Sequence, residues 1–219
     1  MIKKSIKSSE FDPDCRLCPR ISRHFDDIRS VYPSYHCGPV AAFGDKKPRL
    51  LIVGLGPGLH GANATGRPFT GDHAGILLYQ MLYEFGFSNQ AIATHKNDGL
   101  KLHNCRITNA VKCLPPANKP LPTEIKNCNS YLQAELAALH DKLVILALGR
   151  VAHEAILSAM NLRKKDYPFA HNAVHEISSV SYLLDSYHCS RYNTQTRRLT
   201  EDMFRKVFST ATRLINEQN

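Results

Sequence analysis

Long apolar runs are absent from this 219-residue sequence. No stretch approaches the roughly 20 consecutive apolar residues that a membrane-spanning helix needs, so we expect no association with a membrane. The first residues, MIKKSIKSSEFDPD, lack the apolar segment of a secretory signal, and we expect an intracellular, cytoplasmic protein. Internal repeats and low-complexity segments are also missing, and a hydrophobic content of 43% supports a folded domain.

Acidic residues are in the minority. The chain has 19 Asp and Glu against 28 Lys and Arg, which gives a formal net charge of +9. Such an excess favours polyanionic partners, chiefly nucleic acid, although a merely basic surface is an equal alternative. Because no run of five or six like charges occurs, we expect the charge to be spread over a folded surface rather than held in a tail.

Disulfide bonds are not expected, because seven cysteines are an odd number in a chain that we interpret as cytosolic. Cys15 and Cys18 form a CxxC, and Cys113 and Cys128 form a second, wider pair. Four thiolates can hold zinc or a [4Fe–4S] cluster, and the spacing leaves both open. The alternative is an incidental CxxC with two buried apolar thiols. The remaining cysteines are expected to be core or loop thiols: Cys37, Cys105 and Cys189.

Strand-like and helix-like segments alternate along the chain. Apolar runs bounded by turn residues predict four strands, at Leu50–Val53, Arg106–Val111, Leu143–Leu148 and Ser181–Tyr187. Helical spacing predicts helices at Ile76–Phe85, Thr123–Leu139, Val151–Met160 and Leu199–Ile215. The alternation predicts an α/β fold with three layers, α/β/α, around a central, mainly parallel four-stranded sheet. We expect residues 13–219 to form a single domain, preceded by a mobile segment, residues 1–12.

A glycine-rich loop, GLGPGLHGANATGRPFTGDHAG, runs from Gly54 to Gly75 after the first predicted strand. A loop of this length at the carboxyl end of a strand is more often a functional site than a connector. Its glycines let the backbone approach a ligand, and Phe69 and Asp72 are available to a bound group. Gly56–Gly61 also fits GxGxxG, but more loop follows instead of a helix, so dinucleotide binding is the weaker interpretation. No GK[ST] follows, which excludes a Walker loop.

Two other polar segments also follow predicted strands. Residues Asn109–Pro122 follow the second strand, and Ser186–Thr200 ends the fourth. The latter carries His188, Ser, Asn, Thr and three arginines, which are donors suited to phosphate oxygens and to a base edge. Taken alone, His188 is more often an ordinary surface histidine. Because ligands of such folds bind outside the carboxyl ends of the strands, we expect both segments to meet the glycine loop.

These motifs together resemble the iron–sulfur uracil-DNA glycosylases, and family 5 most closely. The resemblance is carried by the glycine loop, by NAVKCLPP (residues 109–116) with Asn118-Lys119-Pro120, and by His188–Thr200, and it runs from Cys15 to Met203. It implies an α/β/α fold and a monofunctional hydrolase of base excision repair, which removes uracil, hypoxanthine or xanthine from DNA. The implied partner is DNA that contains such a base, and we expect a monomer.

The resemblance also implies roles for particular residues. Asp72 would orient or deprotonate the water and stabilise an oxocarbenium-like sugar, and His188 would stabilise the departing base. Phe69 would stack on the flipped base, and Asn109 or Asn118 would read its edge. The backbone of the first glycines would hold a base carbonyl or the water: Gly54, Gly56, Pro57 and Gly58. A structural [4Fe–4S] cluster, with zinc as the less favoured alternative, would be held by Cys15, Cys18, Cys113 and Cys128.

The sequence departs from the family's pattern at a few positions. The family commonly has alanine at Gly56, arginine at Ala64, proline at Cys189 and glycine at Arg197, and Asn109 is more typical of the related family 4. The change at Cys189 puts base preference and rate in doubt, but Asp72 and His188 are retained. The alternative function is a non-catalytic iron–sulfur protein that binds nucleic acid on the same scaffold.

Overall fold

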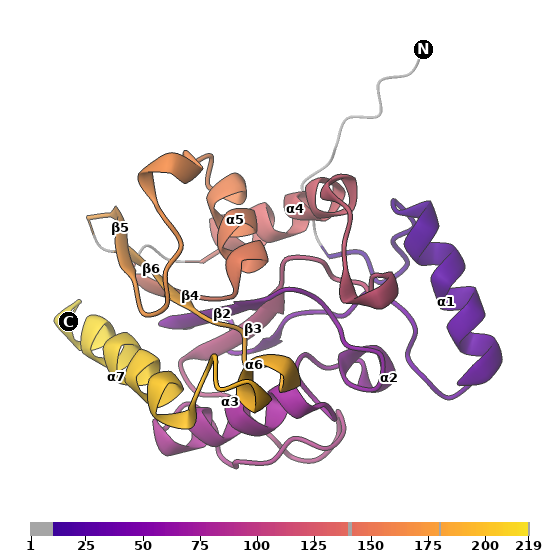
Figure 1. Cartoon of the computed structure of the whole chain (residues 1–219), viewed down its shortest axis with the longest axis horizontal. Helices are drawn as coiled ribbons and strands as arrows, with labels where there is room; N and C mark the ends of the chain where they lie inside the picture. The colour runs from indigo at the N-terminus through magenta and orange to yellow at the C-terminus, as the bar shows by residue number, and fades with distance from the viewer. Residues whose placement is uncertain (1–10, 140–141, 180, 219) are drawn as a thin grey trace.

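A six-stranded sheet forms the centre of the fold (Figure 1). This computed structural model describes residues 11–139, 142–179 and 181–218, so the segment 1–12 that we predicted to be mobile lies almost wholly outside the described residues. The strands follow the order β1-β3-β2-β4-β6-β5 across the sheet. Their bounds are β1 Phe43–Gly44, β2 Leu50–Gly54, β3 Cys105–Asn109, β4 Leu143–Leu148, β5 Val174–Ser178 and β6 Ser181–Ser186.

The four central strands are parallel and coincide with the four predicted strands. The predicted number of strands is wrong, because β1 and β5 pair antiparallel at the two edges. β1 is only two residues long and gives no readable pattern. β5 alternates between exposed and half-buried residues, VHEIS, so it lacks the apolar run by which the buried strands were found.

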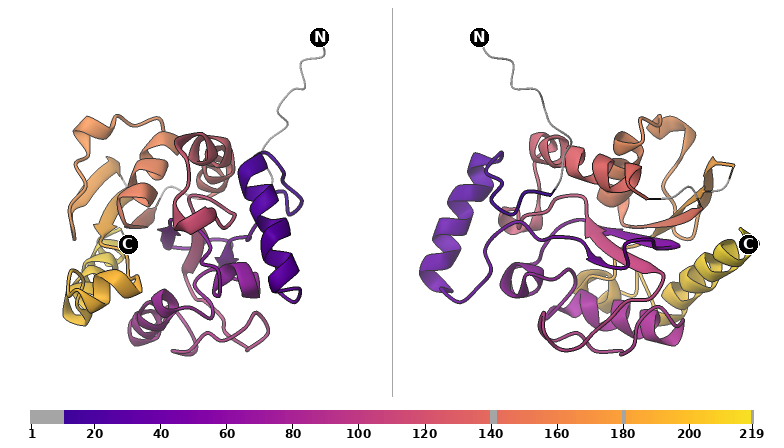
Figure 2. Two further views of the ribbon diagram at one scale, coloured as in Figure 1. Left: turned by 45° about the vertical axis from the view of Figure 1, so that its right-hand side comes forward. Right: turned by 180° about the vertical axis from the view of Figure 1, so that it is seen from behind.

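Helices cover both faces of the sheet, which confirms the predicted α/β/α layers (Figures 1 and 2). Side chains alternate along a strand, so Leu50 and Ile52 of β2 pack on one helical layer and Leu51 and Val53 on the other. The first layer consists of α3, His73–Glu84, and α7, Glu201–Glu217. The second consists of α4, Pro122–Ala137, and α5, Arg150–Ala159.

A further helix, α1 (Pro19–Val31), lies at one end of the molecule beyond these layers (Figure 2). It buries an apolar face, Ile21, Phe25 and Ile28, in a third cluster that includes Cys128. Short helical segments complete the chain: α2 Ala62–Thr65, α6 Arg191–Gln195 and the 3₁₀ turns Pro116–Asn118 and Lys164–Asp166. In the described part of the chain, none of the helices combines the length and apolarity that crossing a membrane requires.

Candidate active site

A cleft of about 460 Å³ opens where the parallel strands end. Its walls come from the loops after β2 and β3, from the start of α5 after β4, and from the segment after β6. This is the position that the strand topology predicts for a ligand site. Six of the predicted site residues line it: Gly56, Gly58, Phe69, Asp72, Asn118 and His188. The structure therefore brings the proposed carboxylate and imidazole into one cleft.

Asp72 is the N-cap of α3, and both of its oxygens are held in place. Oδ1 accepts a hydrogen bond from the backbone N–H of Gly75 at 3.0 Å. Oδ2 lies against bare backbone, since a Cβ on Gly58 would come within 3.1 Å of it and a side chain on Gly61 would overlap it. Burial raises the pKa of Asp72, and the N–H groups of Gly75 and Ala74 partly counter this effect.

His188 follows β6 and faces the ring of Phe69, with the ring centroids 5.9 Å apart. Burial lowers the pKa of His188 to about 4, so the imidazole is neutral near pH 7 and offers one N–H donor. The Nδ2 atom of Asn193 donates to the backbone oxygen of His188 at 2.8 Å. The Sγ atom of Cys189 donates to the carbonyl oxygen of Ala74 at 3.4 Å, which ties the histidine segment to the start of α3.

Phe69 has a backbone conformation that non-glycine residues rarely adopt, with φ of +53°. Its ring lies over Gly54, where a Cβ would come within 2.7 Å of Cζ. Its carbonyl oxygen lies against Gly75, where a Cβ would overlap it. The preceding Arg67 forms a buried bidentate ion pair with Asp98, at 2.8 and 2.6 Å. Such a conformation persists only where its surroundings enforce it, as these contacts do here.

Asn109 lies beneath the cleft rather than in its lining. It ends β3 directly opposite Gly54 of β2 and is nearly fully buried. Its Oδ1 atom has no hydrogen-bond partner among the described residues. A buried polar atom without a partner costs about 1–3 kcal/mol, and such atoms often mark a ligand or water position. Gly54 and Pro57 are also outside the lining, whereas Asn118 is exposed at its rim.

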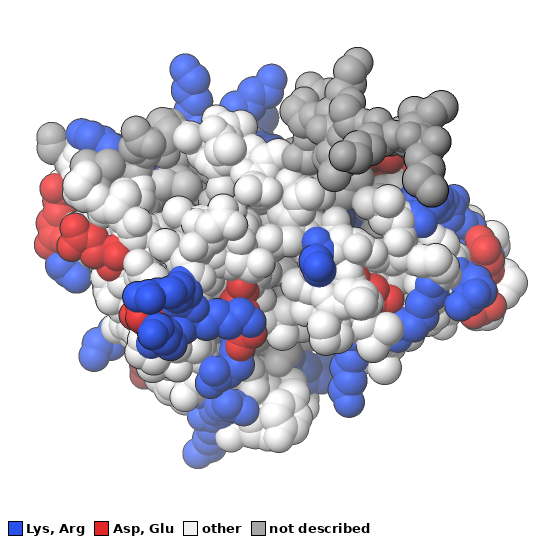
Figure 3. All heavy atoms as spheres, turned by 90° about the horizontal axis from the view of Figure 1, so that it is seen from above, with Lys and Arg blue, Asp and Glu red and all other residues white. Residues whose placement is uncertain are grey.

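Basic side chains surround the mouth of the cleft. Arg150 and Arg191 line the cleft itself, and Arg150 and Arg198 line an adjoining hollow of about 330 Å³. All three are exposed, and none of them forms an ion pair with any residue that the structure describes. Figure 3 shows Lys and Arg side chains spread over one face of the molecule, with acidic side chains between them. On this face, the basic side chains are therefore distributed over the folded surface.

The four predicted ligand thiols line a second, small cavity of about 20 Å³ between α1, α4 and the segment after β3. The backbone N–H of Lys112 donates to Sγ of Cys128 at 3.2 Å. Burial raises the pKa of Cys128 to about 11, and it also raises the pKa of Cys113 and of Cys18. Protonated thiols are poor ligands, so a bound cation would be needed to hold this set as thiolates. The remaining cysteines are buried elsewhere: Cys37, Cys105 and Cys189.

A family model and several known proteins match most of this chain. The family model described as the Uracil DNA glycosylase superfamily matches residues 41–212. The chain belongs to this superfamily. A protein of Thermus thermophilus named type-5 uracil-DNA glycosylase is 44% identical over 205 residues, which cover 91% of this chain and 93% of that protein. The family resemblance that the motifs predicted is thereby confirmed.

Two further relatives of this glycosylase superfamily member come from other organisms. A Mycobacterium bovis protein with the same type-5 name is 38% identical over 208 residues, 91% of this chain and 78% of that protein. A protein of Archaeoglobus fulgidus named type-4 uracil-DNA glycosylase is 30% identical over 199 residues, 88% of this chain and 86% of that protein. The similarity extends beyond the motifs, because each alignment covers most of both chains.

The sequence predictions missed one wall of the glycosylase-like cleft, the start of α5. Gly149 and Arg150 both line the cleft directly after β4. Gly149 has φ of +93°, and a Cβ there would lie 3.5 Å from Cβ of His188. The rule that selected the segments after the other three strands applies equally to this strand and would have found both residues.

Proposed function

We propose that the protein is a monofunctional DNA glycosylase, which hydrolyses the N-glycosidic bond of uracil in DNA and leaves an abasic site. Hypoxanthine and xanthine are included as further substrates. The observation that carries this proposal is the placement of Asp72, His188 and Phe69 around one cleft at the carboxyl ends of the strands. The type-5 and type-4 names of the relatives support the same activity.

The substrate nucleotide is flipped out of the duplex and enters the cleft, because the bond to be broken is not accessible inside the stack. Phe69 supplies a stacking surface for the base. The unpartnered Oδ1 atom of Asn109 accepts a hydrogen bond from a base N–H, and Asn118 contacts the base from the rim. The backbone N–H groups of Gly54, Gly56 and Gly58 approach a base carbonyl or the water, and Pro57, which has no N–H, fixes their turn.

Bond cleavage leaves positive charge on the sugar and negative charge on the base. Asp72, held as an N-cap, presents its carboxylate to the sugar and the attacking water. His188, neutral because burial depresses its pKa, donates a hydrogen bond to the departing base. Among the described residues that line the cleft there is no lysine, so a Schiff base with the abasic sugar is not expected.

The thiol set of Cys15, Cys18, Cys113 and Cys128 holds a [4Fe–4S] cluster in this proposal. All four sulfur atoms line one cavity. Four cysteine thiolates are the ligand set of such a cluster, and zinc is the less favoured alternative. When bound, the cluster supplies a structural link between the segment before α1 and the sheet.

DNA is the proposed partner, and the enzyme acts on it inside the cell as a monomer. Arg150, Arg191 and Arg198 at the cleft mouth are the proposed phosphate contacts, because they are exposed and free of ion pairs with the described residues. Their position beside the cleft lets the phosphate backbone pass while one nucleotide enters.

The test is an excision assay on duplexes that carry uracil, hypoxanthine or xanthine at one position. Abasic product is detected as strand cleavage after alkali, with an undamaged duplex as the control. Product from the uracil duplex supports the glycosylase, and the other two duplexes test the wider substrate range. Binding of DNA without product from any of the three duplexes would favour the non-catalytic alternative.

A further inference from the structure

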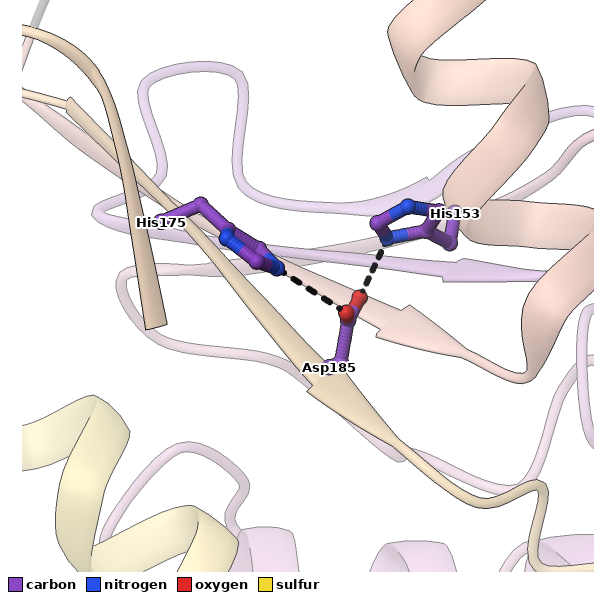
Figure 4. Close-up of side chains that lie close together, drawn as sticks. All are labelled: His153, His175 and Asp185. Atoms are coloured by element: carbon purple, nitrogen blue, oxygen red, sulfur yellow. Dashed lines mark hydrogen bonds and ion pairs between the residues drawn. The ribbon is translucent and has the colours of Figure 1, made fainter. Parts of the chain in front are cut away.

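Three side chains that the proposed excision does not use converge at β6, outside the lining of the cleft. His153 comes from α5, His175 from β5 and Asp185 from β6, and both imidazoles point at the carboxylate (Figure 4). His153 Nδ1 lies 2.7 Å from Oδ1 of Asp185, and His175 Nε2 lies 3.4 Å from its Oδ2. One ligand atom from each residue lies within 4.8 Å of the other two.

The hydrogen bonds of His153 determine whether its Nδ1 atom carries a proton or presents a lone pair. Its Nε2 atom lies 2.9 Å from the carbonyl oxygen of Tyr167, which can only accept a hydrogen bond. Nε2 therefore carries the ring proton, and in the neutral ring Nδ1 presents its lone pair to the carboxylate of Asp185. Two acceptors at 2.7 Å need a cation with them: a second proton fits this distance directly, whereas a tetrahedral metal ion with bonds of about 2.0–2.1 Å needs the two atoms to separate to about 3.3 Å. In metal sites, the ring nitrogen of histidine that does not bind the metal commonly donates its N–H to a backbone carbonyl. Nε2 of His153 has this arrangement with Tyr167.

His175 distinguishes these two cations. A second proton on His153 would satisfy only Oδ1 of Asp185. His175 Nε2 and Asp185 Oδ2 would still face each other only at 3.4 Å, without a well-formed hydrogen bond to any described residue. A metal ion uses all three groups at once. The Asp185 side chain has 0% of its surface exposed and that of His175 13%, so neither is satisfied by bulk solvent.

We infer that His153, His175 and Asp185 bind a divalent transition-metal ion of the zinc class at a structural site. Two imidazoles and a carboxylate are a donor set that Zn²⁺ accepts. The rings of Phe169 and Tyr167 pack on the two histidines, at 5.5 and 5.8 Å between centroids, and restrict access of water. This enclosure favours a structural ion over a catalytic one.

A metal ion at this site would stabilise the position of β6, the strand that precedes His188. Asp185 precedes His188 by three residues, and its backbone forms hydrogen bonds with Asn172 and Ala173 at 2.8 and 2.9 Å. A metal ion joining α5, β5 and β6 would hold the end of β6 in place. The inference is independent of the proposed reaction, because none of the three residues lines the cleft.

The test uses tag-free protein with its iron content intact, titrated with ZnCl₂. Bound zinc and iron are measured by mass spectrometry after removal of free metal, and Tm is followed in parallel. We expect one zinc ion per chain, unchanged iron and a rise in Tm that depends on zinc concentration. His175→Gln keeps an N–H near the carboxylate but removes the imidazole ligand, and should weaken zinc binding at least tenfold. His103→Gln, at an exposed histidine, is the matched control and should not.

X-ray absorption of the bound zinc distinguishes this site from the thiol cavity. Nitrogen and oxygen ligands at about 2.0–2.1 Å support the inference, whereas sulfur at about 2.3 Å would assign the zinc to the cysteines and overturn it. Absence of zinc from the wild type, or equal affinity in His175→Gln, would show a shared proton only and would also overturn it.

Discussion

The carbonyl oxygen of Phe69 rests on Gly75, where any side chain would overlap it. Gly75 lies in the first turn of α3, so the start of this helix fixes the rare backbone conformation of Phe69. The same helix begins at Asp72, the proposed catalytic carboxylate. One short segment thus sets both the stacking ring and the charged group of the cleft.

Gly75→Ala should therefore lower excision at least tenfold and reduce Tm. In an ordinary helix the same change would stabilise by up to about 1 kcal/mol, so the sign of the effect is informative. Gly38→Ala is the control, because a Cβ there meets only ordinary contacts at 3.4 Å and beyond. Wild-type activity and Tm in Gly75→Ala would mean that the loop relaxes without consequence for Phe69.

Asp72→Asn and Asp72→Ala separate the charge of Asp72 from its N-cap role. Both should lower the single-turnover excision rate by a factor of about 10² or more, because the charge acts in the transition state. Only the alanine variant should also lose stability, by about 1 kcal/mol, because asparagine caps a helix as well as aspartate does. Affinity for a duplex with a non-hydrolysable uridine analogue should change little in either. Equal losses of affinity and rate would contradict the proposed role.

The free energy of unfolding should decrease as the pH is lowered from 6.5 to 4, because burial lowers the pKa of His188. Its pKa falls from 6.5 to about 4 on burial, so in this window the folded state binds fewer protons than the unfolded state. Folding stability therefore rises with pH there, by at most about 3 kcal/mol from this group. Urea unfolding at several pH values should show a shallower dependence in His188→Gln. His171, whose pKa burial also lowers, and carboxyl groups with a lowered pKa such as Asp98 also contribute to the slope, and an unchanged slope in the variant would refute the assignment.

Arg150→Ala and Arg191→Ala should weaken DNA binding uniformly across sequences. Each lost phosphate contact reduces the slope of log K against log salt by about 1. Excision at saturating DNA should be nearly unchanged, since neither guanidinium has a proposed role in the chemistry. Arg163→Ala is the control, an exposed arginine that pairs with Asp166 away from the cleft. Salt titrations of affinity for undamaged and uracil-containing duplexes provide the measurement.

Cys113→Ser should abolish the brown colour of an iron–sulfur protein and lower Tm. Cys37→Ala is the comparison, because Cys37 belongs to the same apolar cluster as α1 but does not line the thiol cavity. It should keep the visible absorption. Iron analysis and the absorption spectrum decide the matter, and a colourless wild type that contains zinc at these thiols would refute the cluster.

The central strands could be predicted because buried parallel strands are continuous apolar runs, as in Leu143–Leu148. Helix α1 has the apolar spacing of a helix, with Ile21, Phe25 and Ile28 four and three residues apart, but it lies outside the alternation of strands and helices that predicts the other elements. It packs in a separate apolar cluster at the end of the molecule and not on the sheet.

The position of the cleft could be predicted from the sequence, because each segment that lines it follows a parallel strand. The two asparagines could not be ranked from sequence, whereas the structure buries Asn109 beneath Phe69 and leaves Asn118 at the rim. The group His153, His175 and Asp185 has no local signature. It depends on the pairing register of β5 with β6, which shifts between Glu176 and Ser178.

The thiol cavity brings together segments that are far apart in the sequence, since Cys15 precedes α1 and Cys128 lies within α4. During translation the last of these thiols leaves the ribosome only after β2, β3 and the whole glycine loop. The fourth ligand of the proposed cluster therefore becomes available only after these segments are synthesised, and closing so large a loop has an entropic cost. Loss of the proposed cluster would remove this link between the segment before α1 and α4, so limited proteolysis of iron-depleted protein should cut that segment first.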